Sequence, residues 1–161
     1  MFFSTIFLLF LFIIFLEMII IFRKYYLFKI KKDVINSYSN DELFIILKRM
    51  YYLKCNNFLG VSLFNQVCDI FDRESINSYF FNKNKTYIKF FNGKFFINDY
   101  RIGERSCVQV NNSCIVVKTN CNFPYLLKIF LLCSKNIFVC DFVNEDYFFL
   151  NDFCNSHNVF V

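Results

Sequence analysis

The sequence of 161 residues has little of the material from which catalytic sites are most often built. It contains three glycines, one proline and one histidine, and it has neither tryptophan nor alanine. Three glycines cannot supply a glycine-rich phosphate-binding loop. The single histidine, His157, excludes a histidine-rich metal site and leaves poor material for a Cys–His or Ser–His pair. We therefore expect no catalytic residues, no metal and no cofactor.

The cysteines also lack the spacing of a metal or redox motif. No C-x-x-C pair occurs, which excludes a zinc knuckle and a thioredoxin-like motif. An even number of cysteines in a small domain is typical of disulfides in an oxidising compartment, and we favour this over reduced, buried thiols. The recurrent seven-residue spacing favours cysteines that meet in pairs on successive strands. The disulfide candidates are Cys55, Cys68, Cys107, Cys114, Cys121, Cys133, Cys140 and Cys154.

Apolar side chains are abundant, and they are densest in the first segment of the chain. Residues 2–22 read FFSTIFLLFLFIIFLEMIIIF, with Glu17 as the one ionisable residue. About 20 apolar residues are enough for a helix to cross a bilayer. No basic residue precedes the run and no small residues lie near its end, unlike in a cleaved signal peptide. We predict a retained, single-pass transmembrane anchor over residues 1–22.

A cluster of basic residues follows the apolar segment and accounts for most of the net charge of +5. We interpret residues 23–38 as a basic juxtamembrane collar and linker that meets anionic lipid headgroups rather than nucleic acid. The positive-inside rule places the domain beyond it in the cytosol. The cysteines and two candidate glycosylation sites favour the lumenal or external side, which we prefer. The basic residues are Arg23, Lys24, Lys29, Lys31 and Lys32, and the glycosylation candidates are Asn84 and Asn111.

Residues 39–161 predict one α+β domain, with one or two helices and a mainly antiparallel sheet. Ser39 and Glu42 have the spacing of a capping box, and an apolar stripe continues to about Lys54. A second short helix or irregular segment covers residues 59–71. The later acidic residues, Asp141, Glu145, Asp146 and Asp152, are interpreted as a solvated loop between strands.

The clearest strand signal is the hairpin over residues 87–98, because Asn92-Gly93 suits a type I′ turn. A two-residue loop places Phe90 opposite Phe95 on a core face and leaves a mixed face of aromatic and lysine side chains. That mixed face is either a partner surface or a solvated face, and we favour the latter. We expect a second hairpin over residues 106–118, a buried strand or short helix over 125–132, and strands over 137–143, 147–150 and 159–161.

An N-terminal anchor, the basic pair Arg23-Lys24 and a cysteine-containing domain resemble the small envelope proteins of large insect DNA viruses. The cysteine series resembles that of the per os infectivity factors, of which the short, nineteen-kilodalton class is closest in size. It runs Cys107…Cys114…Cys121…Cys133…Cys140-Asp141-Phe142-Val143…Phe149…Cys154. In those viruses an apolar segment followed by basic residues resembles the signal that sorts proteins to the inner nuclear membrane.

The resemblance implies a non-catalytic subunit of an oral infectivity complex in the virion envelope, which mediates viral entry at the host midgut surface. Its partners would be the membrane, other viral envelope proteins and a host cell-surface component. Two alternatives stay open. The first is a poxvirus-type entry–fusion component, which also has an N-terminal anchor and a disulfide-bonded ectodomain. The second is a cytosol-facing, membrane-tethered adaptor with reduced cysteines.

Overall fold

The computed structural model describes residues 23–53, 57–83 and 87–156. The predicted anchor over residues 1–22 lies outside the described residues, as do Cys55, Asn84, His157 and the strand expected over residues 159–161. Within the described ranges, no helix is long and apolar enough to span a bilayer.

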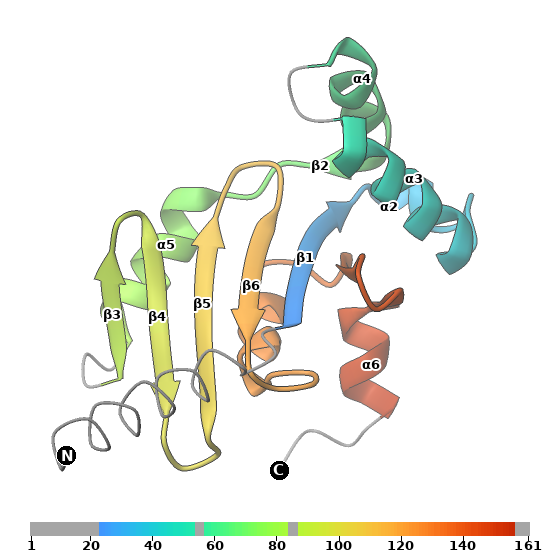
Figure 1. The fold of residues 1–161 in the computed structure, drawn as a ribbon. Helices are drawn as coiled ribbons and strands as arrows, with labels where there is room; N and C mark the ends of the chain where they lie inside the picture. Colours follow the sequence, from blue (N-terminus) through green and yellow to red (C-terminus); the bar gives the residue numbers. More distant parts are fainter. Residues whose placement is uncertain (1–22, 54–56, 84–86, 157–161) are drawn as a thin grey trace, which may run out of the picture.

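The described chain is built on one antiparallel sheet in the order β3-β4-β5-β6-β1-β7-β8, with β2 paired to β1 (Figure 1). This confirms the α+β class and the antiparallel sheet. The strands are β1 (Arg23–Ile30), β2 (Cys68–Asp69), β3 (Ile88–Phe91), β4 (Lys94–Asp99), β5 (Glu104–Val110), β6 (Ile115–Thr119), β7 (Ile137–Asp141) and β8 (Asp146–Phe149). The helices are α2 (Lys32–Ile35), α3 (Asn40–Leu53), α4 (Phe58–Val67), α5 (Arg73–Asn82), η1 (Tyr125–Leu132) and α6 (Leu150–Ser156).

The central strand is β1, which pairs with β6 on one side and with β7 on the other. Its residues Tyr25, Tyr26, Leu27 and Phe28 are all buried. A strand buried on both faces is a continuous apolar run rather than an alternating one. The structure thus differs from our expectation of a linker over residues 23–38, because residues 23–30 form the middle of the sheet.

Helices cover the two faces of the sheet unequally. On one face α5, η1 and α6 pack along the sheet and bury a large core that includes Tyr25, Phe95 and Phe130. On the other face α2, α3 and α4 bury a second core around Phe28 and Phe138, on β1 and β7. Figure 1 looks onto the second face, with α5 and η1 behind strands β3–β6. The β3–β6 half of that face carries no described helix.

Helix α3 begins at the predicted capping box. The backbone N–H of Ser39 donates a hydrogen bond of 2.8 Å to the Glu42 carboxylate, and the Glu42 N–H donates one of 3.3 Å to Ser39 Oγ. These bonds satisfy backbone donors that a helix start leaves free. The predicted apolar stripe is buried at Leu43, Leu47 and Met50.

The expectation of one or two helices is wrong, because the described residues also form α2, α5, α6 and η1. The segment expected over residues 59–71 is α4 followed by β2. Helix α5 starts where Asp72 Oδ1 accepts a hydrogen bond from the Ser75 N–H over 3.1 Å, and it buries Ile76 and Phe80. The apolar run over residues 125–132 is the 3₁₀ helix η1 rather than a strand.

Both predicted hairpins are confirmed. Phe90 lies opposite Phe95 across β3 and β4, and Asn92 and Gly93 have positive φ values of 48° and 73°. Phe90 stays partly exposed because β3 is an edge strand, although its ring meets Phe81 of α5. The second hairpin joins β5 to β6, with a turn that follows Val110.

Candidate functional site

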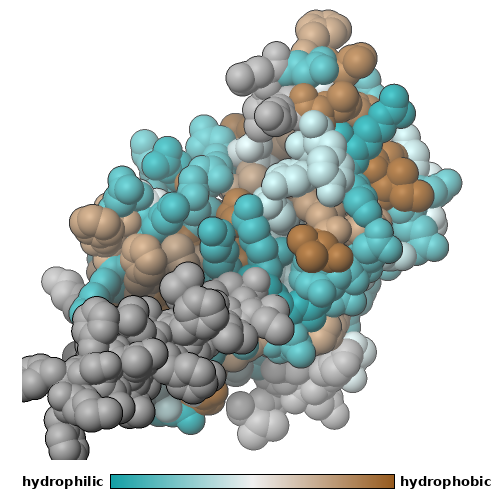
Figure 2. Space-filling model, in the orientation of Figure 1, coloured by the Kyte–Doolittle hydropathy of each residue, from teal (hydrophilic) through white to brown (hydrophobic). Residues whose placement is uncertain are grey.

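We call the helix-free side of strands β3–β6, together with the start of β1, the open face. Strand register brings one side chain from each strand into a single row across it, namely Lys89, Phe96, Cys107, Lys118 and Lys24. Side chains alternate along a strand, so residues two positions away share this face. Figure 2 shows hydrophilic side chains over β5 and β6 beside apolar side chains over β3 and β4.

The open face is hollowed by a groove of about 550 Å³ that only strand residues line. Four lining residues are basic and none is acidic. A concave surface lined by one sign of charge attracts ligands of the opposite sign. We call this feature the basic groove, and its cationic residues are Lys24, Lys94, Arg105 and Lys118.

Exposed phenylalanines lie on the β3–β4 hairpin, where Phe96 lines the groove. Phe91 is 72% exposed and Phe96 is 39% exposed, and both belong to the mixed face that the sequence predicted. Exposed aromatic rings beside cations are typical of protein interaction surfaces. Arg105 and Lys118 were missed as members of this surface. The alternation of Arg105, Cys107 and Gln109 with buried residues in β5 is the signal that would have found it.

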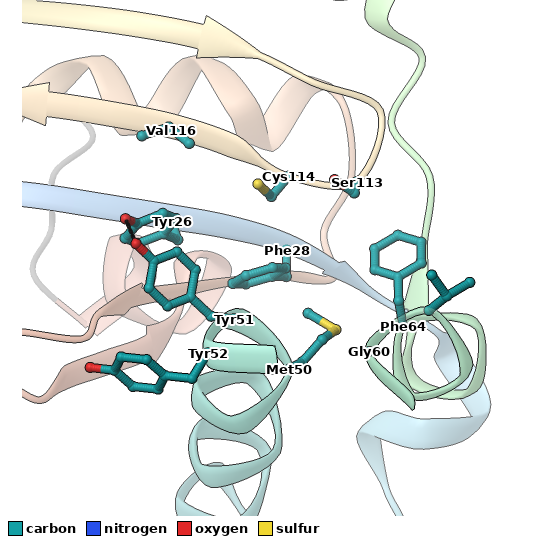
Figure 3. Close-up of a pocket in the computed structure, with 11 residues that line it drawn as sticks. Tyr26, Phe28, Met50, Tyr51, Tyr52, Gly60, Phe64, Ser113, Cys114 and Val116 are labelled. Atoms are coloured by element: carbon teal, nitrogen blue, oxygen red, sulfur yellow. Dashed lines mark hydrogen bonds between the residues drawn. The ribbon is translucent and has the colours of Figure 1, made fainter. Parts of the chain in front are cut away.

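A second cavity of about 550 Å³ lies between the α3–α4 pair and the faces of β1 and β6 (Figure 3). Its walls are almost wholly apolar and aromatic, and we call it the apolar cavity. Figure 3 shows Tyr26 and Phe28 facing it from β1, and Met50 and Tyr51 from α3. The remaining lining residues are Tyr52, Gly60, Val61, Phe64, Ser113, Cys114 and Val116.

The phenols of Tyr26 and Tyr51 meet at the wall of the apolar cavity, where their oxygens are 2.8 Å apart in a hydrogen bond. Burial raises the pKa of Tyr26, and the bond to Tyr26 raises the pKa of Tyr51. Both phenols therefore stay neutral at physiological pH. Val116 lines both cavities, and Lys24 Nζ lies 4.7 Å from the centre of the Tyr26 ring. The two cavities are therefore neighbours along β1 and β6.

Arg23 holds the start of β1 to the β7–β8 hairpin. Its Nε donates to Asp141 over 3.0 Å, and its guanidinium also pairs with Asp146. Burial disfavours the charge, but the bonds to Asp146 and Asp141 outweigh it and raise the pKa of Arg23. Asp141 is fully buried, so the interpretation of this acidic residue as part of a solvated loop is wrong. It accepts hydrogen bonds from the backbone N–H groups of Val143 and Asn144 and so shapes the turn.

The other predicted collar residues point in different directions. Lys24 lies in the basic groove, whereas Lys31 donates to the carbonyl of Asn65. Lys32 is exposed on α2, and Lys29 is half-buried at the end of β1 that pairs with β2. Only Lys24 of the five lines the basic groove.

The strand register places neither Cys107 nor Cys140 opposite another cysteine. Cys107 lies opposite Lys118 and Phe96, and Cys140 lies opposite Tyr26 and Tyr147. The expectation that cysteines on successive strands meet in pairs is therefore wrong for these two residues. Cys68 and Cys140 are buried in one core and Cys154 in the other, while Cys107 and Cys121 are half-buried and Cys133 is exposed. No disulfide joins the described cysteines, and burial raises the pKa of Cys68 to about 12.

Two further polar features complete the described surface and core. Asn111, a glycosylation candidate, is half-buried in the β5–β6 turn. Glu104 is buried and accepts two hydrogen bonds of 2.8 Å, one from Ser106 Oγ and one from the Tyr125 N–H. Burial raises the pKa of Glu104 despite these bonds. Because Tyr125 starts η1, the carboxylate serves as a helix cap.

Among the residues that the structure describes, no group of three or more histidine, cysteine or acidic side chains is arranged to hold a metal ion. The arrangement is suited to binding: a basic groove, exposed aromatic rings and an adjoining apolar cavity. No model of a known protein family matches the chain, and no matching sequence is found among curated proteins.

Proposed function

We propose that the chain is a single-pass viral envelope protein whose domain acts without catalysis, as a binding subunit of an oral infectivity complex. The observation that carries this proposal is the open face, whose cations and exposed rings lie on β1 and on strands β3–β6 to one side of it. Residues 2–22 have the length and composition of a membrane anchor, and β1 begins at Arg23. A domain without a linker after its anchor would work at the membrane surface.

The contact with other subunits is proposed to lie on the β3–β4 hairpin and the open face. Edge strand β3 offers unpaired backbone groups, which another chain can extend by strand addition. Phe91 and Phe96 supply apolar area, and Lys89 and Lys94 supply charge that favours an acidic partner surface. The viral identity comes from the cysteine and anchor resemblance.

Native electrophoresis of the full chain, extracted from membranes of infected cells with mild detergent, tests this function. We expect the chain to migrate in a complex whose other members are viral envelope proteins, identified by mass spectrometry. Phe91→Asp should release the chain from that complex. Tyr100→Asp is the matched control, because Tyr100 is also a strongly exposed ring, in the β4–β5 turn. A chain that migrates as a monomer, or two variants with equal effects, would contradict the proposal.

A second candidate function is favoured by the thiols. Cys68 and Cys140 pack in a core, as small hydrophobic side chains do. Reduced thiols and the positive-inside rule both suit a cytosol-facing, membrane-tethered adaptor. The binding surface would be the same, and only the side of the membrane would differ.

A further inference from the structure

We propose that the apolar cavity and the basic groove together form one binding site for a long-chain fatty acid anion. The hydrocarbon chain would occupy the apolar cavity, and the carboxylate would lie on Lys24 and Lys118. The site requires neither a particular side of the membrane nor an infectivity complex, so it goes beyond the proposed function.

The size and lining of the apolar cavity support the position of the chain. Its volume of about 550 Å³ lies within the roughly 300–1,000 Å³ of typical ligand sites, which are mostly apolar. Tyr26, Phe28, Met50 and Phe64 bring rings and a flexible thioether to its walls (Figure 3). Tyr26 and Tyr51 are neutral and are hydrogen-bonded to each other, so they do not require a charged ligand group inside the cavity.

The proposed position of the carboxylate follows from two lysines that face each other and have no acidic side chain beside them to neutralise their charges. Lys24 on β1 is directly opposite Lys118 on β6, and like charges in such a cross-strand pair repel. Neither lysine forms an ion pair within the described residues, and no acidic residue lines the groove. Arg23, the adjacent cation, is already paired with Asp141 and Asp146. An anion between Lys24 and Lys118 would relieve the repulsion.

The apolar cavity and the basic groove adjoin each other, so one ligand has to fill both. This requirement restricts the chemical class of the ligand. Val116 lines both cavities, and Lys24 lies over the ring of Tyr26 at the boundary. A nucleotide or an acidic peptide would leave the apolar cavity without an occupant. An apolar peptide would leave the two lysines uncompensated. One chain with one negative head meets both requirements.

Photo-crosslinking of the full chain in phosphatidylcholine nanodiscs tests the site. The probe is palmitate with a diazirine in its chain, and mass spectrometry maps the labelled residues. We expect labels on Met50, Tyr51 and Phe64. Oleate should compete for the site, whereas oleyl alcohol, which has the same chain without the charge, should compete at least roughly tenfold more weakly.

Variants separate the two halves of the site. The Lys24→Gln and Lys118→Gln double variant should weaken labelling at least roughly tenfold, because each basic side chain contributes attraction to an anionic head. Lys89→Gln is the matched control, since Lys89 is in the same row but lines neither cavity. Val61→Trp should abolish labelling by filling the cavity from a side chain that is 44% exposed, with little effect on the fold.

Three results would each overturn the site. The first is labelling that is absent or spread evenly over the exposed residues. The second is competition by oleyl alcohol equal to that of oleate. The third is a Lys89→Gln effect as large as that of the double variant. If the double variant does not fold, the competition experiment and the Val61→Trp variant still test whether the site exists. A chain that stays in the membrane but is not labelled refutes the lipid site and leaves the proposed anchor and binding role intact.

Discussion

Asp141→Ala is expected to be among the most destabilising single changes on the sheet. The carboxylate is fully buried and accepts hydrogen bonds from Arg23 Nε at 3.0 Å, the Val143 N–H at 3.1 Å, and the N–H and side-chain amide of Asn144 at 3.2 and 2.6 Å. Alanine removes all four bonds at once. It also leaves the guanidinium of Arg23, whose side chain is 12% exposed, with Asp146 as its remaining ion-pair partner.

The size of the effect follows from burial. Removing one partner of a buried ion pair costs about 3–5 kcal/mol of unfolding free energy, because an uncompensated charge stays behind. Asp146 continues to neutralise Arg23, so the lower end of the range applies, at about 3 kcal/mol. The surface pair between Lys48 and Glu145 provides the comparison, and Glu145→Ala should have a much smaller effect because water screens an exposed ion pair.

Thermal unfolding of the full chain in detergent, followed by far-ultraviolet circular dichroism, measures the difference. We expect the Asp141→Ala midpoint to fall by about 10 °C, and the Glu145→Ala midpoint to change by only a few degrees. Asp141→Asn should fall between them, because it keeps part of the turn but not the charge. Equal midpoints for Asp141→Ala and Glu145→Ala would refute the role of Arg23 in fixing β1 to the β7–β8 hairpin.

Three further predictions concern local features. The raised pKa of Glu104 adds stability that is complete below the unfolded pKa of about 4.3 and is lost as the pH rises through the folded pKa. Urea midpoints measured between pH 4 and 7 should therefore fall as the pH rises, and Glu104→Gln should remove this pH dependence. An unchanged pH dependence in the variant would refute the role of Glu104. Ser39→Ala should lower the unfolding free energy by about 1 kcal/mol in urea titrations, through loss of the bond to Glu42, whereas no change would show that the cap is not formed. In the reduced, folded chain at pH 8, Cys68 should resist alkylation while Cys133 reacts, as counted by mass spectrometry, and equal rates would contradict the burial of Cys68.

Local signals in the sequence predicted the elements whose ends are set by short-range chemistry. Asn92-Gly93 fixed a hairpin register that the structure reproduces at Phe90 and Phe95, because a type I′ turn leaves no freedom in strand pairing. The pair Ser39 and Glu42 marked the start of α3 for the same kind of reason. In both cases two or three neighbouring residues determine the geometry.

The central strand could not be recognised because its signal depends on tertiary structure. Tyr25 to Phe28 form a continuous apolar run, which is typical of a strand buried on both faces but follows an even longer apolar segment in the sequence. Asp141 was misread for a related reason. A carboxylate in a turn is usually solvated, and its long-range partner Arg23, 118 residues away, cannot be recognised from the local sequence.

The candidate site was predicted only in part. The mixed face of the β3–β4 hairpin was visible from alternation, but the basic groove needs Lys24 and Lys118 to pair across β1 and β6, which are far apart in the sequence. The apolar cavity could not be foreseen, since it lies where α3 and α4 approach the sheet. Cysteine spacing was uninformative because register, rather than spacing, places Cys107 and Cys140.

The side of the membrane on which the domain folds decides between the two candidate functions. The direct measurement is labelling of Cys133, which is exposed, by a membrane-impermeant maleimide in sealed microsomes that contain the full chain, with Cys133→Ser as the control. For an envelope subunit, whose domain faces the lumen, Cys133 should be labelled only after detergent opens the vesicles. Labelling of Cys133 in intact vesicles would contradict the envelope function and establish a cytosol-facing domain.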